Sequence, residues 1–246
     1  MNIQLFQIYF DAKSKKTLDK LLIAFYNIDK AFRWFENDVL RRLFVKNKFD
    51  ETADYCGVTS WRLTEKTGFT AAELFHQIQQ DKTPVDCYFY STEYLFCKRP
   101  KISDIGFHKE WITALNNAAI LPYKIDIDIL DGANKCYCNY FLVRPHILKD
   151  YIKTVLIPAM YFFDNSNACK KLREQTVTHR GIQYPVAPMV MELQFAYYMY
   201  YMKISNKHLM TENIKEHMVK FIDTDTGEVF HLFNNQKISE SCLKNL

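Results

Sequence analysis

Glycine and proline are scarce in this sequence, which holds six glycines and seven prolines among 246 residues. No GxGxxG, GxxxxGK(S/T), HExxH or GxSxG motif occurs. The sequence therefore gives no support to a phosphate site on a Gly-rich loop, a zinc-protease helix or a serine-hydrolase nucleophile. Few chain breakers also argue against linkers and disorder. We expect a single domain over 1–246, with a helix and hairpin appendage from about 204 to 246.

Long apolar runs are also missing. No stretch reaches the roughly 20 residues that span a bilayer, and the first residues, MNIQLFQIYFDAK, lack the basic and apolar regions of a signal peptide. The seven cysteines are odd in number and irregularly spaced, and Cys136-x-Cys138 is not a zinc spacing. These features predict a cytoplasmic protein with reduced thiols and no transmembrane segment.

The charge is nearly balanced, with 32 basic and 28 acidic residues and a net charge of +4. This balance argues against a nucleic-acid partner. It is compatible with an anionic small ligand, or with a loose association with the anionic inner face of a membrane.

Alternating patterns predict an α/β fold in which a mixed sheet is flanked by helices. We expect strands at 3–10, 84–91, 125–129 and 140–143, and a strand that runs into a polar loop over 54–62. Helices are expected at 32–45, 64–68, 70–79, 105–119, 145–156, 159–173 and 189–203. The segment 18–26 is expected to be a short helix or irregular. A capping box at Thr70–Glu73 marks one helix start, and Gly68 marks the end of the helix before it.

The segment 126–158 organises the predicted site. A strand with alternating isoleucines is followed by a turn at Asp131-Gly132, a second strand at 140–143 and a helix that begins at Pro145. In open α/β sheets, ligands bind beyond the carboxyl ends of the strands. Polar side chains at these junctions, Asn139 among them, therefore predict a small-molecule pocket.

Three further polar residues lie at or just beyond strand ends. Gln7 and Tyr9 end the first strand, where they can contact a base or ribose; the alternative is that they only cap the strand. Arg62 follows the second strand and can clamp a phosphate with its planar guanidinium, or form a structural salt bridge. Glu192 interrupts an apolar helix, and a carboxylate is costly to bury without a partner.

Asp126-Ile127-Asp128 has the DxD form that holds a divalent cation, Mn²⁺ or Mg²⁺, against a diphosphate. Three residues with two fixed positions arise easily by chance. Alternation with isoleucine supports an equally good interpretation, in which both aspartates form the solvated face of an edge strand.

Five blocks, QIYF, DYCGVTSWR, VDCYFYS, YCNYFLVRP and YPVAPMVMELQFAYYMYY, together resemble bacterial glycosyltransferases of capsule and lipopolysaccharide synthesis. The resemblance spans residues 3 to about 203. It implies a GT-A-like, Rossmann-like fold. It also implies transfer of a sugar from a nucleotide-sugar donor to a glycan or lipid-linked acceptor.

The resemblance implies that Gln7, Tyr9 and Arg62 contact the donor nucleotide, that Asn139 lines the pocket and that Glu192 is a site carboxylate. An inverting transfer needs a base for the acceptor hydroxyl and positive charge for the leaving diphosphate.

We expect Glu192 or Asp126 as the base, and Asp126 and Asp128 as ligands if a metal is used. Retaining chemistry stays equally open.

Two departures support an alternative, a non-catalytic relative that binds sugar nucleotides or carbohydrates. The Glu-Arg pair of the last block is Glu192-Leu193 here, and the strand at 84–91 ends without an aspartate pair.

Overall fold

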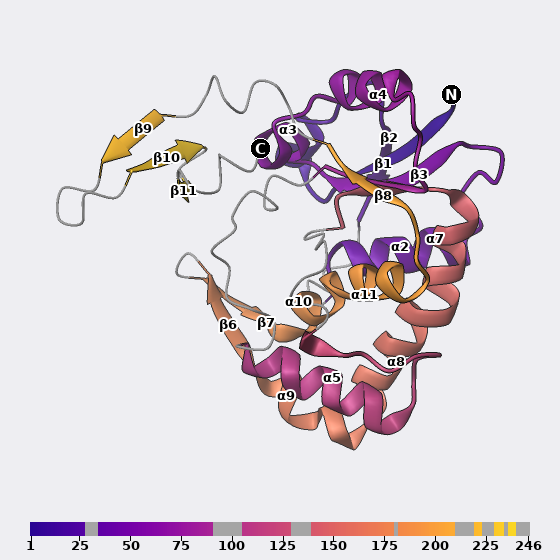
Figure 1. Ribbon diagram of the computed structural model, residues 1–246, viewed down its shortest axis with the longest axis vertical. Coiled ribbons are helices and arrows are strands. Elements are labelled where there is room, and N and C mark those ends of the chain that lie inside the picture. Colours follow the sequence, from indigo (N-terminus) through magenta and orange to yellow (C-terminus); the bar gives the residue numbers. More distant parts are fainter. Residues whose placement is uncertain are drawn as a thin grey trace.

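The computed structural model describes residues 1–27, 34–90, 105–128, 139–179 and 182–209, together with the backbone of strands at 219–222, 229–233 and 236–239. Six strands form a mixed sheet in the order β2-β1-β3-β5-β4-β8, which lies in the upper part of Figure 1. The expected α/β class, a mixed sheet flanked by helices, is confirmed. The strands are β1 (Ile3–Tyr9), β2 (Ile23–Tyr26), β3 (Tyr55–Ser60), β4 (Cys87–Phe89), β5 (Phe141–Val143) and β8 (Asn206–His208).

The directions of the strands define two edges of this sheet. β1 is parallel to both β2 and β3, β4 is parallel to β8, and β5 runs antiparallel to its neighbours β3 and β4. The carboxyl ends of β1, β2, β3, β4 and β8 therefore meet at one edge, which we call the carboxyl edge. The first residue of β5 lies at the same edge because β5 runs the other way. The opposite side is the amino edge.

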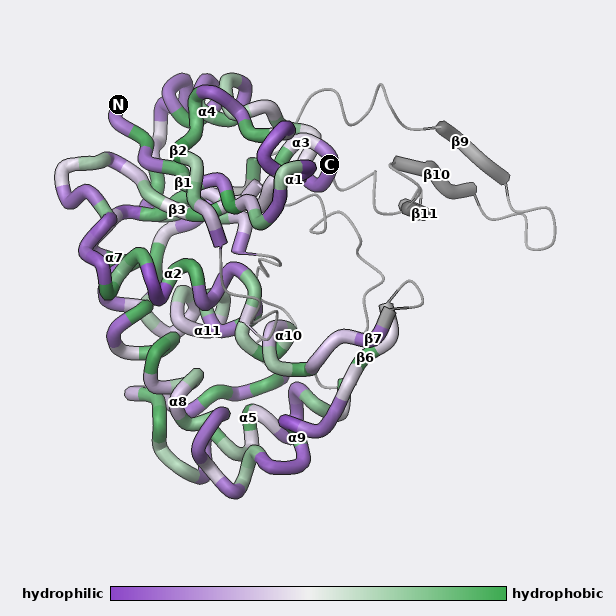
Figure 2. The backbone as a smooth tube through the Cα atoms, turned by 180° about the vertical axis from the view of Figure 1, so that it is seen from behind, coloured by the Kyte–Doolittle hydropathy of each residue, from purple (hydrophilic) through white to green (hydrophobic). Residues whose placement is uncertain are grey.

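Helices cover both faces of the sheet (Figure 1). α3 (Leu63–Thr67) and α4 (Ala71–Gln80) pack on one face around Leu5, Tyr55 and Leu142. The other face carries α2 (Glu36–Val45), α7 (Pro145–Tyr151), α10 (Val186–Glu192) and α11 (Gln194–Tyr201). Hydrophobic and hydrophilic residues alternate around α4, as expected for a helix with one buried stripe (Figure 2).

A further layer lies beyond α10 and α11. It contains α5 (Gly106–Ala118), α8 (Ile157–Asn165) and α9 (Lys170–Glu174), and a π-helical turn at Ile152–Leu156 joins α7 to α8. A 3-10 turn at Asn167–Cys169 precedes α9. The short helix α1 (Ala12–Lys15) follows β1, and β6 (Thr176–His179) pairs with β7 (Ile182–Pro185).

Most of the predicted elements are present. The Thr70–Glu73 capping box forms, with Thr70 Oγ1 accepting from the Glu73 N–H, and Gly68 ends α3 at a φ of 76°. β9 (Val219–Ile222) and β10 (Val229–Phe233) form the expected C-terminal hairpin pairing, which β11 (Gln236–Ser239) extends. Asp131, Gly132, Cys136 and Cys138 lie outside the described residues.

Two expectations were wrong. Residues 23–26 form β2 and not a short helix, because they pair with β1 through four residues in register. Residues 125–128 form no strand: Ile125 packs in the core, and a helical turn begins at residue 127. The Asp128 N–H donates to Asp126 Oδ1 at 3.0 Å, so the alternation of aspartate and isoleucine belongs to a helix cap.

Gly57 allows β3 and β5 to approach each other closely at the centre of the sheet. A Cβ atom at this position would collide with the backbone carbonyl oxygen of Phe141. The residues on either side of Gly57, Cys56 and Val58, are fully buried. The glycine of the YCG block is therefore required by the packing of two backbones, and not by a turn.

We predict that Gly57→Ala lowers the free energy of unfolding by about 3 kcal/mol or more, because the β5 backbone must move away. Urea denaturation measures the change. Gly106→Ala is the matched control: a Cβ there meets nothing within 4 Å, and the position opens α5. Equal effects of the two substitutions would contradict this explanation of Gly57.

His108 is a buried histidine on α5. It is 4% exposed, its ring lies 4.4 Å from that of Phe107, and its Nδ1 has no hydrogen-bond partner among the described residues. Burial lowers the pKa of His108 from 6.5 to about 4. The folded protein therefore holds this side chain neutral at pH values where the unfolded chain binds a proton.

We predict that stability falls as pH drops from 6.5 to 4, with His108 contributing up to about 3 kcal/mol of the loss. His108→Leu should flatten this part of a chemical-denaturation pH profile. His146→Leu, at an exposed position, should leave the parental slope. A parental slope in His108→Leu would show that His108 is not the group that titrates.

Candidate functional site

Ser60, the last residue of β3, joins three of the elements at the carboxyl edge. Its backbone carbonyl accepts from Gln7 Nε2 at 3.4 Å, and its Oγ accepts from the Arg62 N–H at 3.1 Å. The same Oγ lies 2.8 Å from the hydroxyl of Tyr140, which leads into β5. The structure thus brings Gln7, Arg62 and the start of β5 together, although no sequence motif singled out Ser60.

Gln7 is 2% exposed and hydrogen-bonded at both ends of its amide. Its Oε1 accepts from the Asp19 N–H at 2.6 Å, which ties the connection between β1 and β2 to the carboxyl edge. Thr59 pairs with Gln7 across β1 and β3. Thr59 Oγ1 is buried and has no partner in the described part of the chain.

Arg62 forms a salt bridge with Glu65, as the second of the two interpretations of this residue predicted. Its Nε donates to Glu65 Oε2 at 2.6 Å, its Nη2 bonds the other carboxylate oxygen, and its guanidinium lies over the ring of Trp61 at 5.8 Å. About a third of the Arg62 side chain and more than half of that of Glu65 are exposed. Because exposed ion pairs contribute little stability, an anionic ligand at this edge can compete with Glu65 for Arg62.

Tyr9 lies farther out along the carboxyl edge. Its ring stacks on that of Tyr26, its register partner on β2, with centroids 5.1 Å apart. Phe10 and Trp61 form an edge-to-face pair next to it, at 6.0 Å. The outer end of the edge is therefore lined by aromatic rings, which suit stacking of a planar base.

Asn139 lies two residues before β5, in the left-handed region with a φ of 54°, which asparagine tolerates better than most residues. It is 1% exposed, and its Nδ2 donates to Oδ1 of Asn37, the second residue of α2, at 3.3 Å. Neither Asn139 Oδ1 nor Asn37 Nδ2 has a hydrogen-bond partner among the described residues. The two buried amides thus retain one unmet acceptor and one unmet donor.

This amide pair is suited to a hydroxyl group, which can accept from Asn37 Nδ2 and donate to Asn139 Oδ1. Each buried donor or acceptor without a partner costs about 1–3 kcal/mol of folding free energy. The pair therefore destabilises the protein unless a bound group supplies the missing hydrogen bonds. Sequence reasoning missed Asn37, since its partner lies 102 residues away. It also missed Gln194, which is fully buried and whose Oε1 has no partner in the same described ranges.

Glu192 ends α10 and is half-buried. Three residues later, Phe195 stacks on Phe141 with centroids 3.8 Å apart and meets Phe89 edge to face at 6.4 Å. Phe141 begins β5 and Phe89 ends β4, so both lie toward the carboxyl edge. The start of α11, with Glu192 just before it, therefore lies on that side of the sheet.

Asp126 lies toward the opposite side. Its N–H donates to the hydroxyl of Tyr201, the last residue of α11, at 2.6 Å. After Tyr201 the chain reaches the amino edge within four residues. There Ser205 Oγ donates to Oδ2 of Asp86, the residue just before β4, at 2.6 Å. An eight-residue helix is about 12 Å long, so α11 separates Asp126 from Glu192.

The expected metal ligands, Asp126 and Asp128, therefore lie at the other end of α11 from the carboxyl edge. Asp126 Oδ1 is also occupied as a helix cap. Within the described ranges, no group of three or more His, Cys, Asp or Glu side chains could hold a metal ion.

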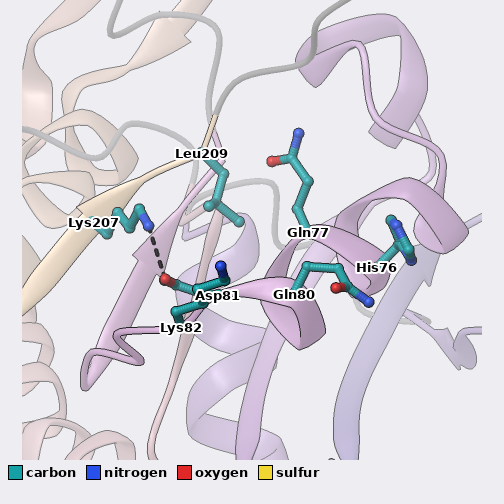
Figure 3. Close-up of a pocket in the computed structure, with 7 residues that line it drawn as sticks. All are labelled: His76, Gln77, Gln80, Asp81, Lys82, Lys207 and Leu209. Carbon is teal, nitrogen blue, oxygen red and sulfur yellow. Dashed lines mark ion pairs between the residues drawn. The ribbon is translucent and has the colours of Figure 1, made fainter.

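A separate open pocket of about 570 Å³ lies between α4 and β8 (Figure 3). Asp81 forms one side of it and accepts from Lys207 Nζ at 3.0 Å and from the Tyr88 hydroxyl at 2.9 Å. His76, Gln77, Gln80, Lys82 and Leu209 complete its lining. None of the residues predicted from the sequence lines this pocket.

No family model, curated protein or solved structure matches this chain.

We predict that the two amides are coupled. Asn37→Ala keeps a good helix former, and Asn139→Gly keeps the positive φ, so both variants should fold. In urea denaturation, the double variant should lose about 1 kcal/mol less stability than the sum of the single variants, because it removes both unsatisfied partners together. Simple additivity would show that the amides do not form one unit.

Proposed function

We propose that this protein is a glycosyltransferase of surface polysaccharide synthesis with a GT-A-like fold. In this proposal it transfers a sugar from a nucleotide-sugar donor to a glycan or lipid-linked acceptor. The observation that carries the proposal is the buried, hydrogen-bonded amide pair Asn37–Asn139 at the carboxyl edge. Unmet buried hydrogen-bonding groups need an occupant, and a sugar hydroxyl has the matching donor and acceptor.

The remaining groups of the edge fit the parts of such a donor. The stacked rings of Tyr9 and Tyr26 offer a face for the base. Arg62 lies two residues beyond the end of β3 and can exchange its exposed carboxylate partner for a diphosphate. Gln7 is better described as a positioning residue, because both ends of its amide are hydrogen-bonded within the protein.

The chemistry assigns Glu192 as the base that accepts the proton of the acceptor hydroxyl. As that oxygen attacks the anomeric carbon, the bond to the diphosphate breaks, and Arg62 stabilises the negative charge that leaves. Asp126 is the weaker candidate, because it lies at the other end of α11 from the edge. Leu193 follows Glu192 where the glycosyltransferases that the sequence resembles have an arginine, so Arg62 is the cation that we assign to the leaving group.

The second candidate function is binding without transfer. The departure at Leu193 favours it, since a missing cation weakens stabilisation of the leaving group. A titration with UDP-, GDP- and CMP-sugars, with and without Mn²⁺, separates the two. Binding with slow donor hydrolysis supports a glycosyltransferase. Binding without turnover supports a protein that binds the sugar nucleotide without transferring the sugar. If no donor binds, both proposals are wrong.

We predict that Glu192→Gln abolishes transfer or donor hydrolysis and leaves donor affinity within about threefold of the parent. Its stability should change by no more than about 1–2 kcal/mol. Turnover assays, calorimetry and thermal unfolding measure these quantities.

Glu174→Gln is the matched control, because Glu174 also ends a helix but is exposed and lies in the layer beyond α10. It should behave as the parent. Parental turnover in Glu192→Gln would exclude Glu192 as the base.

A further inference from the structure

The connection from β1 to β2, together with β2, forms the outer edge of the sheet, and we call residues 10–26 the edge segment. It exposes four large apolar side chains: Phe10 at 42%, Leu21 at 59%, Ile23 at 44% and Tyr26 at 45%. β2 pairs only with β1 among the described strands of this sheet. Exposed apolar residues gathered on one segment indicate an interaction surface.

The same segment is basic. Lys13, Lys15, Lys16 and Lys20 are all exposed, and none forms an ion pair within the described part of the chain. Its two acidic residues are Asp11 and Asp19. The segment therefore combines a local positive charge with exposed apolar side chains.

Both aspartates of the segment are used locally. Asp11 Oδ1 accepts from the Ser14 hydroxyl and N–H, each at 2.6 Å, and these hydrogen bonds lower the pKa of Asp11. Asp19 accepts from the N–H groups of Leu21 at 2.9 Å and Ala71 at 3.3 Å. The carboxylates thus hold the backbone in place, while the lysines point their charge at solvent.

The edge segment is fixed next to the candidate site. Thr17 Oγ1 donates to the Trp61 carbonyl at 2.9 Å, and the Asp19 N–H donates to Gln7. Tyr26 stacks on Tyr9, and the Phe10 ring meets that of Trp61. Anything that binds the edge segment is therefore held beside the carboxyl edge.

We propose that the edge segment docks on an anionic lipid bilayer, with its lysines among the headgroups and Leu21 and Ile23 in the interface. Exposed apolar side chains interleaved with lysines suit an anionic bilayer surface. Insertion of the apolar side chains and attraction of the lysines to the lipid headgroups are each weak, but they add together there. A nucleic acid fits less well, since the segment contains no arginine and its apolar side chains would remain exposed to water in the complex. The inference deepens the proposed function, because it assigns a lipid-linked acceptor that reaches the site from the membrane.

Sedimentation with vesicles tests this docking without any sugar nucleotide. The protein should bind vesicles of phosphatidylcholine mixed with phosphatidylglycerol and fail to bind phosphatidylcholine alone. Lys15→Gln/Lys16→Gln should weaken the partition coefficient about 30-fold, since each lysine at an anionic surface contributes about fivefold. Leu21→Ser/Ile23→Ser should weaken it about tenfold.

A matched control removes four other exposed lysines, Lys46, Lys109, Lys153 and Lys170, by substitution with glutamine. This variant should keep most of the vesicle binding, although its net charge is lower than that of the double variant. An equal loss would show that only net charge matters, and would overturn the proposal. Binding of duplex DNA that depends on Lys15 and Lys16, without vesicle binding, would also overturn it.

The two proposals can fail independently. Vesicle binding in a protein that binds no donor would refute the sugar transfer and leave the docking surface in place. Donor binding with no affinity for anionic vesicles would refute the docking surface alone.

Discussion

The contact between β3 and β5 at Gly57 is the constraint on which the candidate site depends. Because this position carries no side chain, the backbone of β5 reaches the centre of the sheet beside β3. An antiparallel strand inserted there starts where its parallel neighbours end. Asn139 and Tyr140 are thereby delivered to the carboxyl end of β3, within reach of Ser60 and of the first turn of α2. If β5 ran parallel to β3, its last residue, Val143, would lie at the carboxyl edge in place of Asn139 and Tyr140.

Several buried polar groups lie around this junction. Asn37, Asn139, Thr59 and Gln194 are at least 99% buried, and each has an atom without a hydrogen-bond partner in the described ranges. The first two form one unit on the face covered by α2, whereas Thr59 lies beside Gln7. Buried groups of this kind are costly in a fold that is only marginally stable. We propose that a bound ligand completes the Asn37–Asn139 pair among them.

Local signals in the sequence predicted local structure well. The capping box at Thr70 and the left-handed Gly68 depend only on neighbouring residues, and both formed as expected. The Asp126–Asp128 segment was misjudged because alternating aspartate and isoleucine also suits a helix cap in which Ile125 is buried. Asn37 could not have been found, since its significance depends on a partner 102 residues away.

The edge segment and the candidate site are both built on β1, through its parallel pairing with β2 and β3. The most direct test of the account maps the bound donor by amide hydrogen exchange. Whichever nucleotide-sugar binds should protect amides at 7–9, 58–62 and 139–141, at the carboxyl edge. Protection confined to the pocket of His76, Asp81 and Lys207 would contradict the account.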